Sequence, residues 1–185
     1  MKKFLLIACA ASLLMGCNDK TGSSSSSGSD SSKVANSGSG DLVYPYTLDH
    51  PYRDWQPGDQ KHAITVMASL KAFENNDLPN CFTAFGDSVE IAIDGYRDKM
   101  SHDSLTKFFT QQRAGYKTMK VKMQDWESVI AKDKKDEWVT LWYKEFWTDK
   151  TGKADSLDVI DDAKMVNGKI VLLDEKIQHY PPAKK

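Results

Sequence analysis

The hydrophobic period of the chain changes near Gly115, and this change constrains the fold more than any other feature of the sequence. Before Gly115, apolar residues recur every three or four positions, which places them along one face of a helix. After it, apolar and polar residues alternate, as they do in strands with one buried face. Helices followed by a run of long strands predict an α+β domain, with the helices on one face of a curved antiparallel sheet.

The N-terminal half carries the signals of three helices. Asp59 is a suitable capping residue for a helix that continues to about Asn75. One apolar stripe runs along this helix and consists of Ala63, Val66, Met67, Leu70 and Phe73. A second, short helix is expected to end at Gly86, and a third to run from its capping residue Ser101 to Gly115.

The strands are expected in two groups. A short strand over 88–93 lies between the second and third helices. Three or four long strands follow, over residues 118–131, 137–148, 156–166 and 169–179. Polar turns separate the long strands, and Asn167-Gly168 is a strong signal for a tight hairpin. The long strands are therefore expected to pair as consecutive hairpins.

The first residues of the chain resemble the signal peptide of a bacterial lipoprotein. A basic start is followed by an apolar run over 4–15 that is too short to span a bilayer, and then by Leu14-Met15-Gly16-Cys17. The resemblance implies cleavage after Gly16 and a diacylglycerol on the thiol of Cys17. We therefore expect a cell-envelope protein whose partner is the membrane itself, with the lipid in the outer membrane and the domain facing the periplasm or the cell surface.

The segment after the signal peptide is expected to be a flexible tether. Residues 18–40 comprise 23 residues, of which 10 are Ser and 4 are Gly. Such a segment cannot bury enough apolar surface to offset the entropy of ordering. The sequence thus predicts a signal peptide over 1–16, a tether over 17–40 that begins with the lipidated cysteine, and one folded domain over 41–185.

Composition excludes several classes of function. The chain has 25 Lys and Arg against 26 Asp and Glu, so it lacks the basic excess that nucleic-acid binding requires. The four His residues are scattered without metal-ligand spacing, so we expect no metal site and no cofactor. Cys81 is the one cysteine after residue 17, and we interpret it as a small buried residue rather than a catalytic thiol.

Several motifs occur in a characteristic order between residues 59 and 180. They are Phe73-Glu74-Asn75-Asn76-Asp77-Leu78, Asp87-Ser88-Val89-Glu90-Ile91, the stretch from Gly95 through Asp103 to Phe108-Phe109, Trp147-Thr148-Asp149-Lys150-Thr151-Gly152-Lys153, and Asn167-Gly168-Lys169-Ile170. In this order and spacing they resemble the nuclear transport factor 2-like superfamily, in particular its SnoaL-like branch. The resemblance implies a cone-like fold, in which a strongly bent sheet wraps the first long helix and leaves a pocket at its wide end.

Relatives of this kind use the pocket in different ways, so the resemblance leaves function open. Some are isomerases, dehydratases or cyclases, some bind a small ligand, and some only pair with a second copy through the sheet face. The resemblance therefore implies a small apolar ligand or a homodimer as partners.

Two carboxylates stand out on the predicted strands. Asp161 interrupts the alternate apolar residues of the strand 156–166, and Glu145 does the same on the strand 137–148. If these faces point inward, both acids lie in the pocket as candidate catalytic residues, because burial adjusts a carboxyl to proton transfer near neutral pH. Tyr143 is the candidate hydrogen-bond donor, and Tyr143, Trp142 and Trp147 are the candidate ligand-binding residues.

Alternation alone does not decide which face is inward. On the opposite face, Trp138, Trp142 and Phe146 would line the cavity and the acids would lie in solvent. Rings on both faces also suit a core on one side and a partner, or a sugar- or lipid-binding platform, on the other. We expect a non-catalytic, lipid-anchored module that binds a small apolar ligand or a partner protein; the alternatives are a pocket enzyme and a purely structural lipoprotein.

Overall fold

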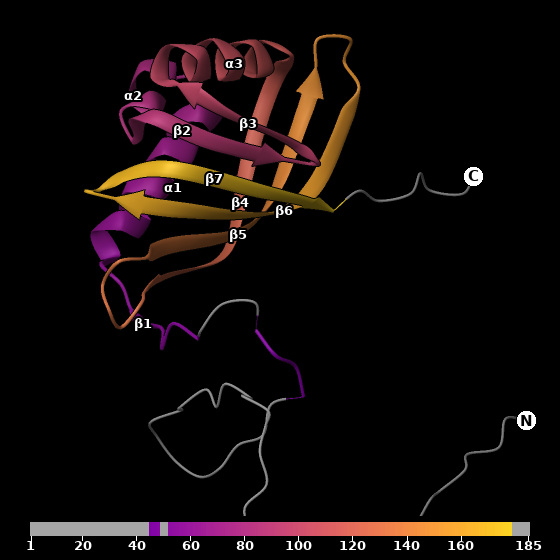
Figure 1. The fold of residues 1–185 in the computed structure, drawn as a ribbon. Coiled ribbons are helices and arrows are strands. Elements are labelled where there is room, and N and C mark those ends of the chain that lie inside the picture. Colours follow the sequence, from indigo (N-terminus) through magenta and orange to yellow (C-terminus); the bar gives the residue numbers. More distant parts are fainter. Residues whose placement is uncertain (1–44, 49–51, 179–185) are drawn as a thin grey trace, which may run out of the picture. The chain divides into compact units, whose positions relative to one another are not determined.

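The structure is a computed structural model that describes residues 45–48 and 52–178 (Figure 1). The signal peptide, Cys17 and the tether lie outside the described residues, and their predicted roles stay predictions. The chain divides between Pro45 and Tyr46 into two units, and the fold below belongs to the second.

Three helices precede the long strands: α1 (Gln60–Glu74), α2 (Leu78–Phe82) and α3 (His102–Ala114). The predicted caps of α1 and α3 are confirmed. The side chain of Asp59 accepts a hydrogen bond from the backbone N–H of Lys61 at 2.8 Å, and that of Ser101 accepts one from Ser104. Among the described residues, no helix has the length and apolar character needed to cross a membrane.

The predicted end of the second helix is wrong. The helix ends at Phe82, and Phe85 already belongs to β2 (Phe85–Ile93). The reason is a long-range contact, because the carbonyl of Ala84 accepts a hydrogen bond from the backbone N–H of Ile170 at 2.9 Å. This bond draws the chain into the sheet before Gly86 is reached.

Seven strands form one sheet in the order β1-β4-β5-β6-β7-β2-β3 (Figure 1). The four long strands are confirmed as a run of antiparallel hairpins: β4 (Tyr116–Ile130), β5 (Glu137–Asp149), β6 (Ala154–Val166) and β7 (Lys169–Gln178). The Asn167-Gly168 hairpin is confirmed as well, since both residues have positive φ, of 51° and 73°.

The sheet is mixed rather than wholly antiparallel, because β2 pairs with β7 in parallel. Two strands are also new: the two-residue β1 (Gln56–Pro57) on the edge beside β4, and β3 (Tyr96–Ser101) on the edge beside β2. A tight turn at Asp94-Gly95, with φ of 46° and 85°, joins β2 to β3. Asp-Gly is a sequence signal for such a turn, but the β3 segment lacks apolar alternation.

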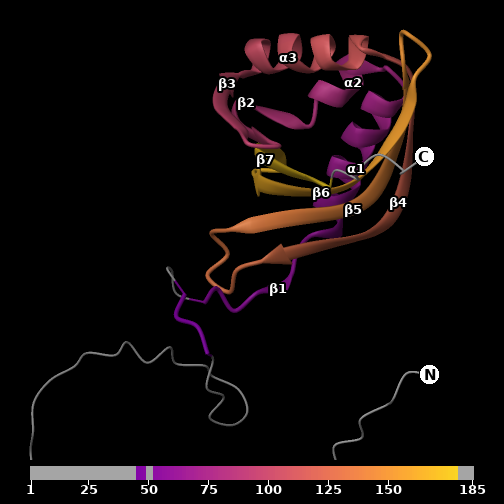
Figure 2. The same cartoon turned by 90° about the vertical axis from the view of Figure 1, so that its right-hand side faces the viewer.

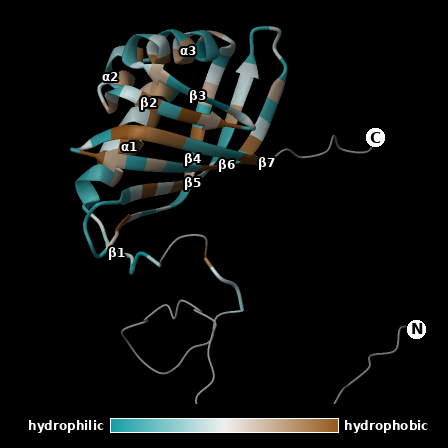
Figure 3. Ribbon diagram, viewed as in Figure 1, coloured by the Kyte–Doolittle hydropathy of each residue, from teal (hydrophilic) through white to brown (hydrophobic). Residues whose placement is uncertain are grey.

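The helices lie against one face of this curved sheet. Figure 2 shows β4 and β5 bending around α1, with α3 across the end of the strands. A register shift between Met123 and Asp125 marks a bulge in β4, a feature that increases the bend of a strand. Hydrophilic and hydrophobic residues alternate along the long strands (Figure 3). The inward set packs on α1 and forms the core, which includes Ala63, Val66, Ile91, Val139, Leu141 and Ala163.

Candidate functional site

A cavity of about 70 Å³ lies between the helices and the inner face of the sheet. This volume is well above the roughly 10–15 Å³ that a single water needs, so the cavity has room for several waters or a small molecule. Its walls are largely apolar and include Val66, Leu70, Phe73, Phe85, Phe109 and Leu173. The core therefore contains a space where apolar surface surrounds whatever polar groups project into it.

Three acidic side chains from adjacent strands project into this cavity: Glu145 of β5, Asp161 of β6 and Glu175 of β7. The strand register brings them together. Asp161 is directly opposite Glu175. Glu145 lies on the same face of the sheet, two residues after Tyr143 along β5. The acids thus converge because an alternate position on each of three paired strands is carboxylic where its neighbours are apolar.

Asp161 has the most enclosed carboxyl group of the three. The residue is only 5 % exposed, and its Oδ2 accepts a hydrogen bond from the Tyr143 hydroxyl at 3.1 Å. The other oxygen, Oδ1, is buried and has no hydrogen-bond partner among the described residues. Buried polar atoms are nearly always paired, so an unpaired carboxylate oxygen beside a cavity indicates a position for a ligand or water.

The cavity raises the pKa of all three acids. Burial, reinforced by the charges of Glu145 and Asp162, raises the pKa of Asp161 to about 7, against the opposing hydrogen bond from Tyr143. Burial also raises the pKa of Glu145 to about 7, although the nearby Arg113 charge opposes it. The half-buried Glu175 has a raised pKa too, first through desolvation and then through repulsion by Asp161 and Glu145.

Arg113 lies near this site but serves as a structural clamp. Its guanidinium donates hydrogen bonds to three backbone carbonyls, those of Phe73 at 2.8 Å, Glu74 at 3.0 Å and Tyr116 at 3.2 Å. These bonds hold the last turn of α1 against the end of α3 and the start of β4. Among the described residues, no ion pair joins a basic side chain to Glu145, Asp161 or Glu175.

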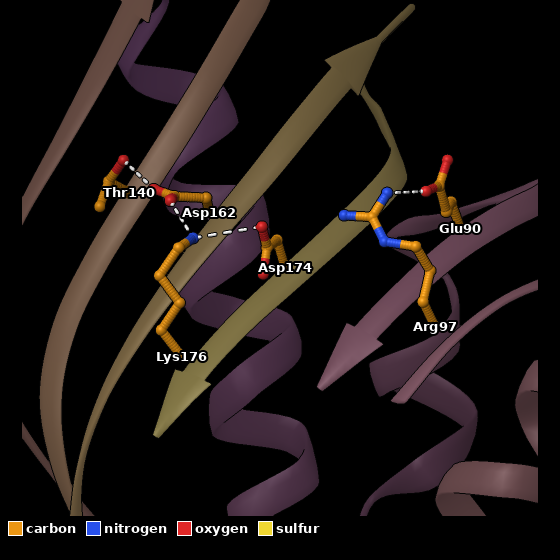
Figure 4. A network of polar contacts seen from close by, with 6 residues as sticks. All are labelled: Glu90, Arg97, Thr140, Asp162, Asp174 and Lys176. Atoms are coloured by element: carbon orange, nitrogen blue, oxygen red, sulfur yellow. Dashed lines mark hydrogen bonds and ion pairs between the residues drawn. The ribbon is translucent and has the colours of Figure 1, made fainter. Parts of the chain in front are cut away.

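On the opposite face of the sheet, acidic side chains are paired with basic ones (Figure 4). Asp162 follows Asp161 directly but points outward, where it accepts hydrogen bonds from Thr140 at 2.7 Å and from Lys176 at 2.6 Å. Lys176 also pairs with Asp174 at 3.3 Å, and Arg97 pairs with Glu90 on the neighbouring β2–β3 hairpin. The outer acids are neutralised by cations, whereas the inner acids are not.

The structure brings together only part of the candidate site. Asp161, Glu145 and Tyr143 all line the cavity. Trp142 does not, because it alternates with Tyr143 on β5 and lies on the outer face, opposite Ile160. Trp147 is on the inner side but near the strand end, with its ring centroid 5.9 Å from that of Tyr116, and it is not part of the lining.

The outer face also holds the other two rings that could have lined the cavity. Trp138 lies beneath the ammonium of Lys164, and Phe146 beneath that of Lys144, each nitrogen 5.8 Å from the ring centroid. The inward direction of β5 is therefore the one that carries Tyr143 and Glu145.

Glu175 and Ser69 are cavity residues that sequence reasoning missed. Glu175 stands between Leu173 and Ile177 at alternate positions of β7, the same pattern that identified Asp161. Ser69 carried no signal, since a small polar residue in an amphipathic helix is ordinary. Its hydroxyl donates to the carbonyl of Cys81 at 2.9 Å, and Cys81 is buried, as expected.

The acids are not arranged as a metal centre. No three His, Cys, Asp or Glu side chains of the described ranges, 45–48 and 52–178, lie close enough to hold one metal ion. What the arrangement can do is accept hydrogen bonds, attract positive charge and exchange protons near neutral pH.

Comparisons with known proteins rest on structure. No protein-family model matches the sequence, and no curated protein matches it. Among solved structures, a nuclear transport factor 2-like protein of unknown function from Exiguobacterium sp. 255-15 matches with a TM-score of 0.53 and 16 % identity, over 63 % of this chain and 99 % of that one. Another from Burkholderia pseudomallei K96243 has a TM-score of 0.53 and 17 % identity, over 64 % and 91 %.

An epoxide hydrolase from M. tuberculosis, described as LEH-like, also matches, with a TM-score of 0.51 and 17 % identity over 64 % of this chain and 84 % of that one. Identities this low are evidence of fold and not of activity. They agree with the bent sheet and the helices on its inner face. The fold expectation is therefore confirmed: the described part of the chain has the nuclear transport factor 2-like α+β fold.

Proposed function

We propose that the protein binds a small molecule in the cavity between α1 and the sheet, with the Asp161–Tyr143 pair at the polar end of the site. The observation that carries the proposal is the buried, unpaired Oδ1 of Asp161 beside apolar walls. A ligand with one polar end and an apolar body would pair this oxygen and cover the Phe and Leu side chains around it.

The cost of the arrangement supports a functional role. An ionised carboxylate in apolar surroundings destabilises a fold by several kcal/mol unless it is paired, and an apolar residue at position 161 would avoid that cost. Such groups cluster at functional sites, where strain in the apo protein is relieved by ligand. A purely structural domain gains nothing from three acids facing one cavity.

Acid–base catalysis is the second candidate, and the pKa of about 7 for Asp161 favours it. A carboxyl group that ionises near the working pH transfers protons in either direction with little driving force lost. One structural neighbour is described as an LEH-like epoxide hydrolase, so an enzyme is among the proteins of similar fold. In an enzyme, Asp161 would exchange the proton and Tyr143 would orient its carboxyl group.

The cellular setting is part of the same proposal. The Leu14-Met15-Gly16-Cys17 motif supports a lipid anchor on Cys17, with the binding domain carried in the cell envelope on the Ser/Gly tether. The outer sheet face, with Trp138, Trp142 and Phe146, is the surface we assign to pairing with a second copy or another protein.

The test is ligand screening on the full-length chain. Small molecules of different charge are screened by thermal shift, and hits are mapped by NMR onto the wild type, Asp161→Asn and Asp162→Asn. A ligand of the cavity raises the Tm of the wild type and of Asp162→Asn, and its effect is reduced in Asp161→Asn. Hits that map only to the outer sheet face, or that depend equally on both Asp residues, contradict the proposal.

A further inference from the structure

The cavity offers hydrogen-bond acceptors and few donors. Oδ1 of Asp161 is unpaired, and no described residue donates a hydrogen bond to the carboxylates of Glu145 or Glu175. The two hydroxyl groups that line the cavity have already used their hydrogens, because Tyr143 donates to Asp161 and Ser69 donates to the carbonyl of Cys81. A ligand that complements these carboxylates in their ionised form must therefore bring the donors.

The nearby cations are committed elsewhere. Arg113 donates its hydrogen bonds to backbone carbonyls at the end of α1 and the start of β4. Lys176 leaves the sheet on the outer side and pairs with Asp162 and Asp174 there, and Lys120 pairs with Glu74. The cavity thus gathers three acids without an internal counterion. Burial is the main cause of their raised pKa values, and neighbouring acids add to it for Asp161 and Glu175.

The geometry disfavours a bare metal ion and favours an organic cation. The described carboxylates do not converge as metal ligands. Instead, the rings of Phe73, Phe85 and Phe109 form part of the wall, with Phe109 packed edge-on against Phe73 at 5.9 Å between centroids. Aromatic faces attract ammonium groups and cover their alkyl substituents, whereas they give nothing to a hydrated divalent ion.

Glu175 occupies a special place in this arrangement. Besides the acidic cavity, it borders a second, more open hollow at the β2–β3 turn, together with Asp94, Gly95 and Tyr96. Glu175 therefore borders both hollows and lies directly across the strand pair from Asp161.

We infer that the ligand of the proposed binding site is a small organic ammonium ion, whose N–H donors bind Oδ1 of Asp161 and the carboxylate of Glu175 while its apolar part packs on Phe73, Phe85 and Phe109. This inference rests on the proposed small-molecule function and specifies its ligand class. It accounts for three features at once: the unpaired oxygen, the gathering of three carboxylates and the absence, among the described residues, of a counterion for the acids.

The inference has a pH signature. Asp161, Glu145 and Glu175 face the ligand. The charges that act on them belong to Arg113, Asp94, Asp162 and Lys176. The neighbouring titratable hydroxyls are those of Tyr143, which donates to Asp161, and Tyr116. Carboxyls with raised pKa values hold protons near neutral pH, and an ammonium ion displaces them. Binding should therefore release protons and grow tighter as the pH rises from 6 to 8.

The experiment is calorimetric titration of the full-length chain with two matched pairs of probes: benzylammonium with benzyl alcohol, and butylammonium with butanol. Each ammonium ion should bind at least about tenfold more tightly than its neutral counterpart at pH 8. The binding heats in phosphate and in HEPES differ by the number of protons released multiplied by the difference between the ionisation enthalpies of the two buffers. The number of protons released should be positive at pH 7.

Three variants locate the effect. Asp161→Asn and Glu175→Gln should each weaken benzylammonium binding at least about tenfold, whereas the matched control Asp162→Asn, whose carboxylate is on the outer face, should leave it unchanged. Circular dichroism and the Tm establish that each variant is folded. If only one of the two inner variants folds, it still decides the comparison with the control.

The outcomes separate this inference from the proposed function. If the alcohols bind as tightly as the ammonium ions and Asp161→Asn weakens both, the inference is wrong and the small-molecule site stands. If no probe of either charge, and no molecule of the wider screen, binds in the cavity, both are wrong. Ammonium binding that Asp162→Asn weakens as much as Asp161→Asn would place the cation on the outer face and overturn the inference.

Discussion

The hydroxyl of Tyr143 on β5 donates a hydrogen bond to Oδ2 of Asp161 on β6, at 3.1 Å, inside the core of the domain. Tyr143 is 1 % exposed and Asp161 5 % exposed, so bulk water does not compete for this hydrogen bond. This single bond fixes one oxygen of the carboxyl group and leaves the other directed at the cavity. A half-satisfied buried acid of this kind is held in one orientation without a basic side chain paired to it.

Asp161→Asn should stabilise the protein increasingly as the pH rises. The pKa of Asp161 is raised from 3.8 to about 7 in the fold, so between these values the folded state holds a proton that the unfolded state has lost. The free energy of unfolding of the wild type then falls with pH, by about 1.4 kcal/mol per pH unit for one proton, from about pH 4 to about pH 7. Because Asn cannot ionise, the Asp161→Asn variant does not lose this part of its free energy of unfolding as the pH rises.

The measurement is urea denaturation of the wild type and Asp161→Asn at pH 5, 6, 7 and 8. The difference in stability should widen toward pH 7 and then level off. Asp162→Asn is the control, and it should show no such widening because its carboxylate is paired with Thr140 and Lys176. A parallel pH dependence of the wild type and Asp161→Asn would contradict a buried, protonated Asp161.

Tyr143→Phe should raise the pKa of Asp161 further. The hydroxyl hydrogen bond stabilises the ionised carboxylate, so its removal leaves burial and the neighbouring acids unopposed. Phe preserves the ring, and the cost in stability at pH 8 should be about 1–3 kcal/mol, because a second carboxylate oxygen is left without a partner. Carbon-detected NMR titration of the Asp side chains measures the shift, and an unchanged or lowered pKa would show that the bond is absent in solution.

Arg113→Ala should destabilise the domain by about 3 kcal/mol. It removes three donors and leaves the carbonyls of Phe73 and Glu74, which are at the end of α1, without side-chain partners. Loss of the positive charge should also raise the pKa of Glu145 above about 7. Chemical denaturation and NMR titration measure the two effects, with exposed Lys107→Ala on the same helix as the control. Equal stability of both variants would contradict the clamp.

Gly58→Ala should destabilise the domain by about 1–3 kcal/mol through steric overlap. A Cβ at Gly58 would be 2.5 Å from Oγ of Ser128 and 3.0 Å from the backbone nitrogen of Val129. The backbone here is tightly joined, since the N–H of Gly58 donates to the Ser128 carbonyl at 2.8 Å. Thermal denaturation should show partial rescue when Ser128→Ala is added.

Gly86→Ala is the matched control for this prediction. Its added Cβ would be 3.5 Å from the nearest atom, a side-chain carbon of Val171, which is an ordinary contact. It should therefore change the Tm much less than Gly58→Ala does. A Gly58→Ala protein as stable as Gly86→Ala would mean that β1 is not held against β4 as described.

Local sequence was sufficient for most of the elements. The stripe from Ala63 to Phe73 forms α1, and the alternating segments form β4 to β7 within a few residues of the predicted bounds. The pattern even identified two of the three cavity acids, because Asp161 and Glu145 interrupt apolar alternation. These features depend on periodicity and turn chemistry, which act over a few residues and are written directly in the chain.

Tertiary structure decided what the local pattern could not. The early end of α2, the parallel pairing of β2 with β7 and the edge strand β3 depend on contacts between distant segments, such as that of Ala84 with Ile170, 86 residues later. Alternation divides a strand into two faces without saying which face the helices cover, so Trp142 and Tyr143 were equally eligible for the cavity.

The contact of Asp161 with Glu175 illustrates what local sequence determines and what tertiary structure determines. The sequence by itself determined that each is a carboxylic acid among apolar alternate residues, because that pattern is local. Only the register of β6 on β7 placed them opposite each other, and only the packing of α1 and α3 on the bent sheet enclosed them with Glu145 in one cavity. Their raised pKa values are produced by that enclosure, since desolvation and mutual repulsion exist only after the distant strands have come together.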